Sequence, residues 1–217
     1  MLRLGMQPLW KSISTVLCLG AHSDDIEIGA GGTILRLLAQ NPDVDVHWVV
    51  LSAADERREE ALKSASSFLG GAARAEVIVK DFEERYLPHN GGDVKRFFDE
   101  LGASISPELV LTHRRDDLHQ DHRLVGELTW NTFRDHLILE YETPKWDGDL
   151  GRPNVFVPLE RAVCEQKVQT ILRSFASQRE RDWFTEETFW AFLRLRGVEA
   201  RSLSGYAEAF HGRKLVV

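Results

Sequence analysis

Short apolar runs alternate with segments of helical periodicity through the first two thirds of the chain. The apolar runs predict five buried strands, at Ser14–Leu19, Val44–Ser52, Glu76–Val79, Glu108–Thr112 and Leu137–Tyr141. The segments between them predict helices at Gly31–Gln40, Asp55–Leu69, Val94–Leu101 and Asp121–Arg134. Such alternation is typical of βαβ units with right-handed crossovers. The predicted fold class is therefore α/β, with a mostly parallel central sheet that carries helices on both faces.

The last third of the chain has a different pattern. The segment Glu142–Pro158 holds three prolines and two glycines without clear periodicity, so we expect a long loop of the kind that often serves function. Amphipathic periodicity then predicts helices at Leu159–Phe175 and Glu186–Arg196. The chain has 217 residues, enough for one well-buried core, and we expect residues 1–217 to form a single domain.

The most informative stretch, GAHSDDIEIG at residues 20–29, lies between the first predicted strand and the first predicted helix. Its histidine and two adjacent aspartates therefore lie on a strand-to-helix turn. Ligands of open parallel sheets bind at the carboxyl ends of strands. His22 and Asp25, three positions apart, supply an imidazole and a carboxylate for a metal ion. The neighbouring Asp24 is then free to act as a base.

A second polar stretch, THRRDDLHQDHR at residues 112–123, follows the fourth predicted strand. It contains His113, His119 and His122 together with three aspartates. His119 and His122 are three positions apart, so they face the same way if a helix begins near them. Two turns rich in His and Asp, each at the end of a predicted strand, predict a mononuclear metal site.

These residue types suit the hydrolysis of a stable amide. Such a reaction needs an activated water, a polarised carbonyl and a proton for the leaving amine, and a divalent metal supplies the first two. Catalytic zinc usually takes three protein ligands and keeps one position open. We predict that these three ligands are His22, Asp25 and His122.

The remaining polar residues of the two stretches have roles in the same reaction. We expect Asp24 to take a proton from the attacking water. His119 is expected to stabilise the oxyanion and to protonate the amine. Asp121 is expected to hydrogen-bond to the His119 ring and fix its tautomer.

The chain resembles the PIG-L/LmbE-like family of metal-dependent N-deacetylases, which carries an AHPDDE motif and a later HPDH-type motif. The corresponding residues are AHSDDI at positions 21–26 and HQDH at positions 119–122. Ser23 stands in place of the usual Pro and Ile26 in place of the usual Glu, and neither change removes a predicted ligand. The resemblance implies a Rossmann-like three-layer fold, usually zinc, and the residue roles given above. It also implies a substrate-contacting arginine, which matches Arg58, with Arg57 as a near competitor.

Two functions from different classes compete. The resemblance implies a hydrolase that removes an N-acetyl or other N-acyl group from an amino sugar or its conjugate. The alternative is a non-enzymatic Rossmann-like module that binds a nucleotide or sugar phosphate through the Gly29–Gly32 turn. The glycine spacing is not GxGxxG and the acidic turn would repel phosphate, which favours the hydrolase. Iron(II) or another divalent ion is an alternative to zinc, because the same ligands serve several metals.

Several residues keep two interpretations at this stage. His113 is either a competing metal ligand or a residue that supports the ligands, or else it is structural or solvent-facing. Asp116 and Asp117 either cap the following turn, or one of them contacts the substrate or supports a metal ligand, with Arg114 and Arg115 as partners. The loop residues that are candidates for the pocket are Glu140, Glu142, Lys145, Trp146 and Asn154. Trp183 is expected in the core, and Cys18 and Cys164 are expected to be unpaired core residues.

Charge and hydropathy limit the partners. A net charge of −7 argues against a nucleic-acid partner, and no apolar run approaches the ~18 residues that span a bilayer. Residues 1–14 lack the apolar stretch of a signal peptide, so a cytoplasmic location is expected. The expected partner is a small amino-sugar or glycoconjugate substrate. The apolar C-terminal helices are candidates for a homo-oligomer contact.

Overall fold

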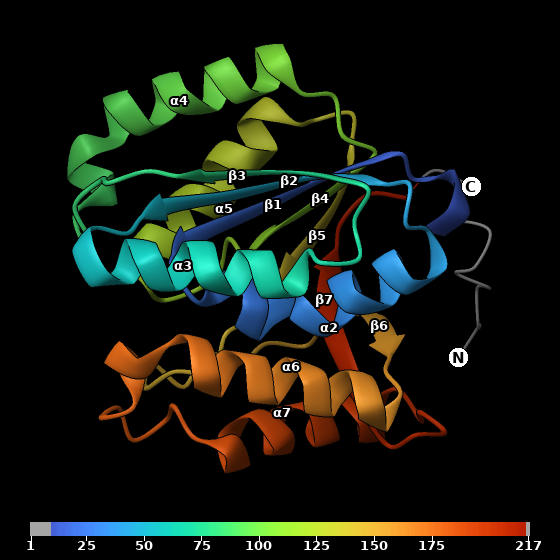
Figure 1. Ribbon diagram of the computed structural model, residues 1–217. Helices are drawn as coiled ribbons and strands as arrows, with labels where there is room; N and C mark the ends of the chain where they lie inside the picture. Colours follow the sequence, from blue (N-terminus) through green and yellow to red (C-terminus); the bar gives the residue numbers. More distant parts are fainter. Residues whose placement is uncertain (1–9, 216–217) are drawn as a thin grey trace.

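A seven-stranded sheet with the order β3-β2-β1-β4-β5-β7-β6 forms the middle layer of the part that the structure describes, residues 10–215 (Figure 1). The structure is a computed structural model. Its strands are β1 (Thr15–His22), β2 (Asp45–Ser52), β3 (Arg74–Val79), β4 (Leu109–His113), β5 (Leu137–Tyr141), β6 (Val155–Pro158) and β7 (Ala207–Gly212). Residues 1–9, most of the segment in which a signal peptide was not expected, lie outside the described residues.

Strands β1 to β5 pair with one another in parallel, as the βαβ pattern predicts. Strands β7 and β6 extend the sheet in antiparallel pairing at one edge. The five predicted strands are confirmed. The prediction of a continuous loop to Pro158 was wrong at its end, where β6 forms, and β7 was not predicted. Strand β6 has only four residues and lies at the sheet edge, and β7 (AEAFHG) lacks the run of large apolar residues that marked the predicted strands.

The sheet is covered on both faces, which confirms the three-layer α/β class (Figure 1). Helices α4 (Gly91–Ser104) and α5 (Gln120–Thr132) cover one face. Helices α2 (Asp25–Gln40) and α3 (Asp55–Phe68) cover the other, and α6 (Arg161–Ser174) packs on them. Helix α7 (Glu186–Glu199) contacts α6 and β7. Alternate residues of β1 feed the two apolar clusters, Val16 and Cys18 one face and Leu17 and Leu19 the other, as a two-residue period requires.

Helix α2 begins six residues earlier than the predicted start at Gly31. The motif GAHSDDIEIG therefore covers the end of β1, a two-residue turn and the first turn of α2. Gly29, Gly31 and Gly32 lie inside helix α2, so the expectation that residues 29–32 form a turn was wrong. They allow close packing: a Cβ on Gly29 would lie 2.2 Å from the Tyr141 ring, and one on Gly31 would lie 2.6 Å from Phe68.

A buried ion pair ties the edge strand β7 to α2. The Lys167 ammonium donates to Glu208 and to the carbonyl of Ile28. The Glu208 carboxylate accepts the backbone N–H groups of Gly32 and Thr33. Both charges are at most 3% exposed. Their hydrogen bonds offset the desolvation that burial imposes, so β7 holds the helix that carries Asp25.

The cysteines Cys18 and Cys164 are buried and free, as expected. None of the helices over residues 10–215 combines the length and apolarity that crossing a membrane requires.

Candidate active site

The two polar stretches meet at the carboxyl ends of β1 and β4. His22 is the last residue of β1 and His113 the last residue of β4, and these strands are neighbours in the sheet. The chain order proceeds from β1 to β2 and β3 on one side and from β4 to β5 on the other. The site therefore lies where the strand order reverses, the place at which open α/β sheets bind their ligands.

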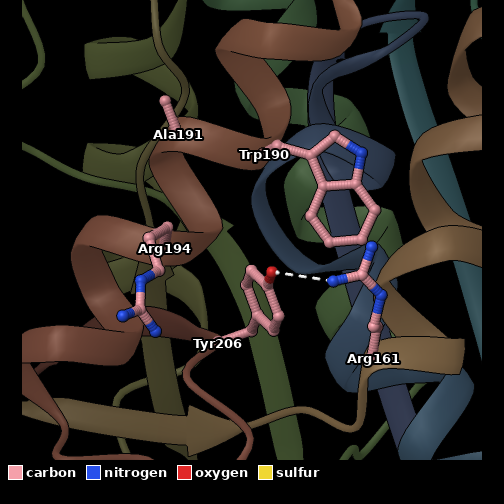
Figure 2. A pocket seen from close by; sticks show the side chains of 5 residues that line it. All are labelled: Arg161, Trp190, Ala191, Arg194 and Tyr206. Carbon is pink, nitrogen blue, oxygen red and sulfur yellow. Dashed lines mark hydrogen bonds between the residues drawn. The ribbon is translucent and has the colours of Figure 1, made fainter.

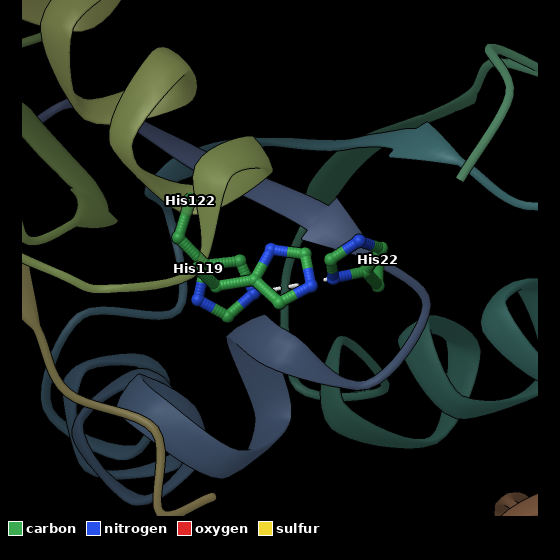
Figure 3. Close-up of side chains that lie close together, drawn as sticks. All are labelled: His22, His119 and His122. Carbon is green, nitrogen blue, oxygen red and sulfur yellow. Dashed lines mark hydrogen bonds between the residues drawn. The ribbon is translucent and has the colours of Figure 1, made fainter. Parts of the chain in front are cut away.

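Side-chain atoms of His22, Asp25 and His122 form a triangle, in which Asp25 presents a different carboxylate oxygen to each histidine. His22 Nδ1 lies 3.2 Å from His122 Nε2 and 3.3 Å from Asp25 Oδ2, and His122 Nε2 lies 3.4 Å from Asp25 Oδ1. Figure 3 shows the His22 ring at the end of its strand and the rings of His119 and His122 reaching it from the start of α5. Zinc bonds of about 2.0–2.1 Å imply spacings of about 3.3–3.4 Å between tetrahedral ligands. The triangle has that size.

Each ring of the triangle carries a carboxylate on its far nitrogen. Asp121 Oδ2 lies 3.0 Å from His22 Nε2, and Asp117 Oδ2 lies 3.2 Å from His122 Nδ1. Each far nitrogen therefore carries the proton and donates it, which leaves the near nitrogens with lone pairs that face one another. Two lone pairs at 3.2 Å repel, and a cation between them relieves that repulsion, so the site could hold a metal ion. Metal-ligating histidines show this carboxylate arrangement.

The pKa values of the two rings differ in a way that is consistent with a cation at this place. Burial disfavours the charged form of His22, but Asp25 and Asp121 outweigh it and raise its pKa to about 10. Burial and the neighbouring His113 lower the pKa of His122 to about 3. One ring thus takes a proton and the other stays neutral, so a proton occupies the place of a cation.

Asp25 is held in position by groups that do not face the cavity. Its Oδ2 accepts the backbone N–H of His22 and lies 3.1 Å from His113 Nε2. His113 is fully buried, stacks on the His122 ring and receives the Ala21 N–H. Two groups among the described residues could hold an ion: His22, His119 and His122, or Asp25, His113 and His122. The His113 ring contacts both Asp25 and His122, and His113 does not line the hollow described next.

A hollow of about 150 Å³ opens beside the triangle. Asp24 and His119 line it together with the three ligand candidates. Burial raises the pKa of Asp24, and Arg57, whose Nη2 lies 3.0 Å from Asp24 Oδ1, opposes that rise. Burial and then the His22 charge lower the pKa of His119. The rim consists of Ile28, Glu84, Arg85, Thr143, Pro144, Lys145, Trp146, Asp147, Gln178, Arg181 and Trp183.

A second hollow, lined by residues of α6, α7 and the segment before β7, lacks such chemistry. Figure 2 shows Arg161, Trp190, Ala191, Arg194 and Tyr206 around it, with the Tyr206 hydroxyl accepting from Arg161. None of these five residues is an acid or a histidine. The reactive groups are concentrated in the first hollow.

Comparison with protein families assigns the chain. The family model described as PIG-L, GlcNAc-PI de-N-acetylase, matches residues 17–133. The chain belongs to the PIG-L family. The matched region holds both polar stretches, so the chain is a member of a de-N-acetylase family rather than a nucleotide- or sugar-phosphate-binding module.

Solved structures share the PIG-L fold of this chain. The N,N'-diacetylchitobiose deacetylase from Pyrococcus horikoshii is 20% identical, with a TM-score of 0.71, over 97% of this chain and 87% of that chain. GalB, the 4-carboxy-2-hydroxymuconate hydratase from Pseudomonas putida KT2440, is 21% identical, with a TM-score of 0.75, over 94% and 98%. The zinc-inhibited form of teicoplanin deacetylase Orf2 is 15% identical, with a TM-score of 0.66, over 91% and 97%. At these identities the likeness concerns the fold, and the activity rests on the PIG-L family match.

Two details of the predicted site differ from the structure. Asp121 was expected to hydrogen-bond to the His119 ring, but its carboxylate contacts His22 and the backbone N–H groups of Arg85 and Leu87. The reason is that Asp121 lies in the first turn of α5 and points across to β1, whereas His119 precedes the helix. The His119 ring nitrogen Nδ1 instead accepts the Asp121 backbone N–H and caps α5.

The structure also separates the two candidate arginines, Arg57 and Arg58. The Arg58 guanidinium donates to the carbonyl of Val79, and Arg58 does not line the hollow. Arg57 lines it and contacts Asp24. Of the two candidate arginines, Arg57 is therefore the one at the hollow, and a substrate contact of either stays a prediction. Adjacent helical residues point about 100° apart, and the sequence alone does not fix which of them faces the site.

The structure also places residues whose roles the sequence left undecided and residues that the sequence did not mark. Asp117 is buried against His122, whereas the Asp116 side chain is 81% exposed. Lys145 and Trp146 line the hollow, but the other loop candidates, Glu140, Glu142 and Asn154, do not. Trp183 is half-buried: it packs against the hydrophobic core, as expected, and also lines the hollow. Arg85, Gln178 and Arg181 come from distant segments without any motif, so no sequence signal marked them.

Proposed function

We propose that this chain is a zinc-dependent deacetylase that removes an acetyl group from the nitrogen of an amino sugar or its conjugate. The observation that carries the proposal is the triangle of His22, Asp25 and His122, whose atoms face one another at 3.2–3.4 Å. The donor set of two imidazoles and one carboxylate is a set that catalytic zinc uses. A divalent metal bound there supplies an acidified water and polarises the carbonyl of the amide.

The residues that flank the triangle move the protons. Asp24 accepts a proton from the attacking water, and the raised pKa of this buried carboxyl suits a general base. His119, whose ring centroid lies 4.9 Å from that of His22, donates a proton to the leaving amine and hydrogen-bonds to the oxyanion. Asp121 holds the His22 ring through its Nε2 and is in this way a positioning residue.

The substrate class rests on the family and on the rim. The rim has two aromatic rings, the exposed indole of Trp146 and the half-buried Trp183, whose ring centroids lie 6.4 Å apart in an edge-on arrangement. The apolar face of a sugar packs against such rings. Two of the similar structures are deacetylases named for diacetylchitobiose and for teicoplanin, and these names support N-acylated sugars as the class to test. Arg57 contacts the substrate in this proposal, as the arginine that lines the hollow.

The test is amine release from a panel of N-acetyl sugars and glycoconjugates. Wild-type protein is stripped of metal and reloaded with zinc or with iron(II), and His122→Ala is treated in parallel. We expect reloaded wild type to release amine and His122→Ala to be inactive. A folded wild-type protein that takes up no metal would refute the proposal. Faster turnover with iron(II) than with zinc would correct the metal and leave the reaction in place.

A further inference from the structure

Lys145 lines the hollow, but its ammonium group contacts buried carboxylates rather than the open cavity. It belongs to the β5–β6 loop, residues 142–154, and its side chain is 10% exposed. The ammonium lies 3.0 Å from Asp117 Oδ2 and 2.7 Å from Asp149 Oδ1. The side chains of both aspartates are also buried, at 4% and 7% exposed. A lysine that served only to attract substrate would present its charge to the cavity instead.

Asp117 links this lysine to the proposed metal ligand. The carboxylate oxygen that accepts from Lys145 is the same oxygen that faces His122 Nδ1, at 3.2 Å. Its other oxygen accepts the backbone N–H of His119 at 2.8 Å. Asp117 therefore sets the orientation of the His122 ring and the place of His119 in the chain. The ion pairs of Asp117 within the described residues are those with His122 and Lys145.

His122 and Lys145, the two partners of Asp117, differ in charge when a metal is bound to His122. A ligating His122 is neutral, so it donates a hydrogen bond to Asp117 without a compensating charge. Lys145 is then the cation that offsets the burial of the Asp117 carboxylate. A buried carboxylate without its cation rearranges or draws in water, because desolvating an unpaired charge is costly. Such a rearrangement releases the His122 ring from its orientation.

We propose that Lys145 is a positioning residue for the metal site, acting on His122 through Asp117. This inference rests on the proposed function, since it takes His122 as a ligand. The β5–β6 loop lies outside residues 17–133, so the lysine adds to the site from beyond the region that the family model matches. Its neighbours Pro144, Trp146 and Asp147 line the hollow, and the residue that orients a metal ligand thus belongs to the loop that receives the substrate.

A simpler role for Lys145 would be to anchor the loop through Asp149. Asp149 Oδ2 also accepts the Leu118 N–H, and the Asp149 carbonyl accepts from Arg114, so Asp149 itself joins the β5–β6 loop to the segment before α5. The two roles differ in what Asp149→Asn does. Removing the Asp149 charge weakens the anchor but leaves the chain from Lys145 through Asp117 to His122 complete.

The experiment measures metal affinity rather than turnover. Zinc dissociation constants are obtained by competition with a chromophoric chelator for wild type, Lys145→Met, Lys145→Arg and Asp149→Asn. The absorption spectrum of each cobalt(II)-loaded protein reports the ligand geometry. We expect Lys145→Met to bind zinc about tenfold more weakly and to alter the cobalt spectrum, as loss of groups that orient ligands does. Lys145→Arg should restore affinity, and Asp149→Asn should stay within about threefold of wild type.

Other results would overturn the inference. Wild-type affinity in Lys145→Met would show that Asp117 does not need the cation. An equal loss in Asp149→Asn would show that loop anchoring, not Asp117, carries the effect. Should Lys145→Met fail to fold, as judged by its melting without metal, Lys145→Gln replaces it with the same expected outcome. A wild-type protein that binds no zinc contradicts the proposed function instead, which keeps the two failures distinct.

Discussion

Asp24 and Asp25 are adjacent carboxylates in different surroundings. Burial works against the charged form of Asp25, but three histidines outweigh it and hold its pKa well below the usual range. Burial raises the pKa of Asp24, and the opposing cation is Arg57. Environments that separate two neighbouring carboxyls in this way assign them different roles. Asp25 is suited to stay ionised as a ligand, and Asp24 to accept a proton.

The first residue-scale prediction separates these roles. We expect Asp24→Asn to keep its metal, because the three triangle residues are unchanged, and to lose amide hydrolysis by roughly 10²–10⁴-fold. Bound metal is measured by elemental analysis and turnover by amine release. Asp116→Asn is the matched control, since that side chain is exposed and outside the hollow. Retained activity in Asp24→Asn would reject this residue as the base.

The second residue-scale prediction concerns the two arginines. The Arg57 charge favours the ionised form of Asp24, so Arg57→Gln should raise the pKa of Asp24 further. Because Asp24 acts when ionised, the acidic limb of the pH profile of kcat/KM should move to higher pH. Arg58→Gln should leave the limb in place, because Arg58 bonds to the Val79 carbonyl. If Arg58→Gln moved the limb and Arg57→Gln did not, the original assignment to Arg58 would stand.

At the scale of elements, helix α2 connects the metal site to the packing of the molecule. Its first residue is Asp25, and Gly29, one turn later, lies against the Tyr141 ring of β5. The Tyr141 hydroxyl donates to the Leu19 carbonyl of β1, which fixes the ring against the helix. The glycines weaken the helix, but they allow it to approach the sheet closely enough for Asp25 to reach His22.

Gly29→Ala tests that approach. The added Cβ would lie 2.2 Å from Tyr141, a contact that forces the helix or the ring to move. We expect a loss of about 1–3 kcal/mol in the free energy of unfolding, measured with urea, together with weaker metal binding. Gly70→Ala is the control, because its Cβ meets atoms no closer than 3.7 Å and should change stability by less than about 0.5 kcal/mol. Equal stability of the two variants would show that α2 does not depend on this close contact.

At the scale of the whole molecule, the two polar stretches join distant parts of the sequence. His22 and His122 are 100 positions apart, and the rim adds Arg181 and Trp183 from near the C-terminal end. A metal bound among these residues cross-links β1, α2 and α5. Binding to the folded state alone stabilises it by mass action.

Metal removal should therefore lower the stability of the whole molecule. At a free zinc concentration 100 times the Kd, we expect about 2.7 kcal/mol of added stability, or roughly 5–10 °C in Tm for a chain of this size. Thermal unfolding with zinc and with a chelator measures the difference. His122→Ala should melt at the same temperature in both conditions. A Tm of wild type that does not respond to zinc would argue against a metal bound by the folded site.

The surface of the whole molecule also bears on assembly. Leu195 and Val198 of α7 and the following Leu203 are exposed, the last at 95%. The homo-oligomer expected from the apolar C-terminal helices stays a prediction, and the molar mass in solution from light scattering tests it.

The sequence alone determined the α/β class, the five parallel strands and the two polar stretches at their ends, because these features depend on local periodicity and on residue types within short segments. It also brought His22, Asp25 and His122 forward as ligand candidates. Tertiary structure decided what depends on contacts between segments: the antiparallel strands β6 and β7, the earlier start of α2, and Asp121 on His22 rather than on His119. The same holds for the contact of Arg57 with Asp24 and for the contact of Lys145 with Asp117. A side chain's direction and its partner across space are fixed by packing, and no local pattern along the chain encodes them.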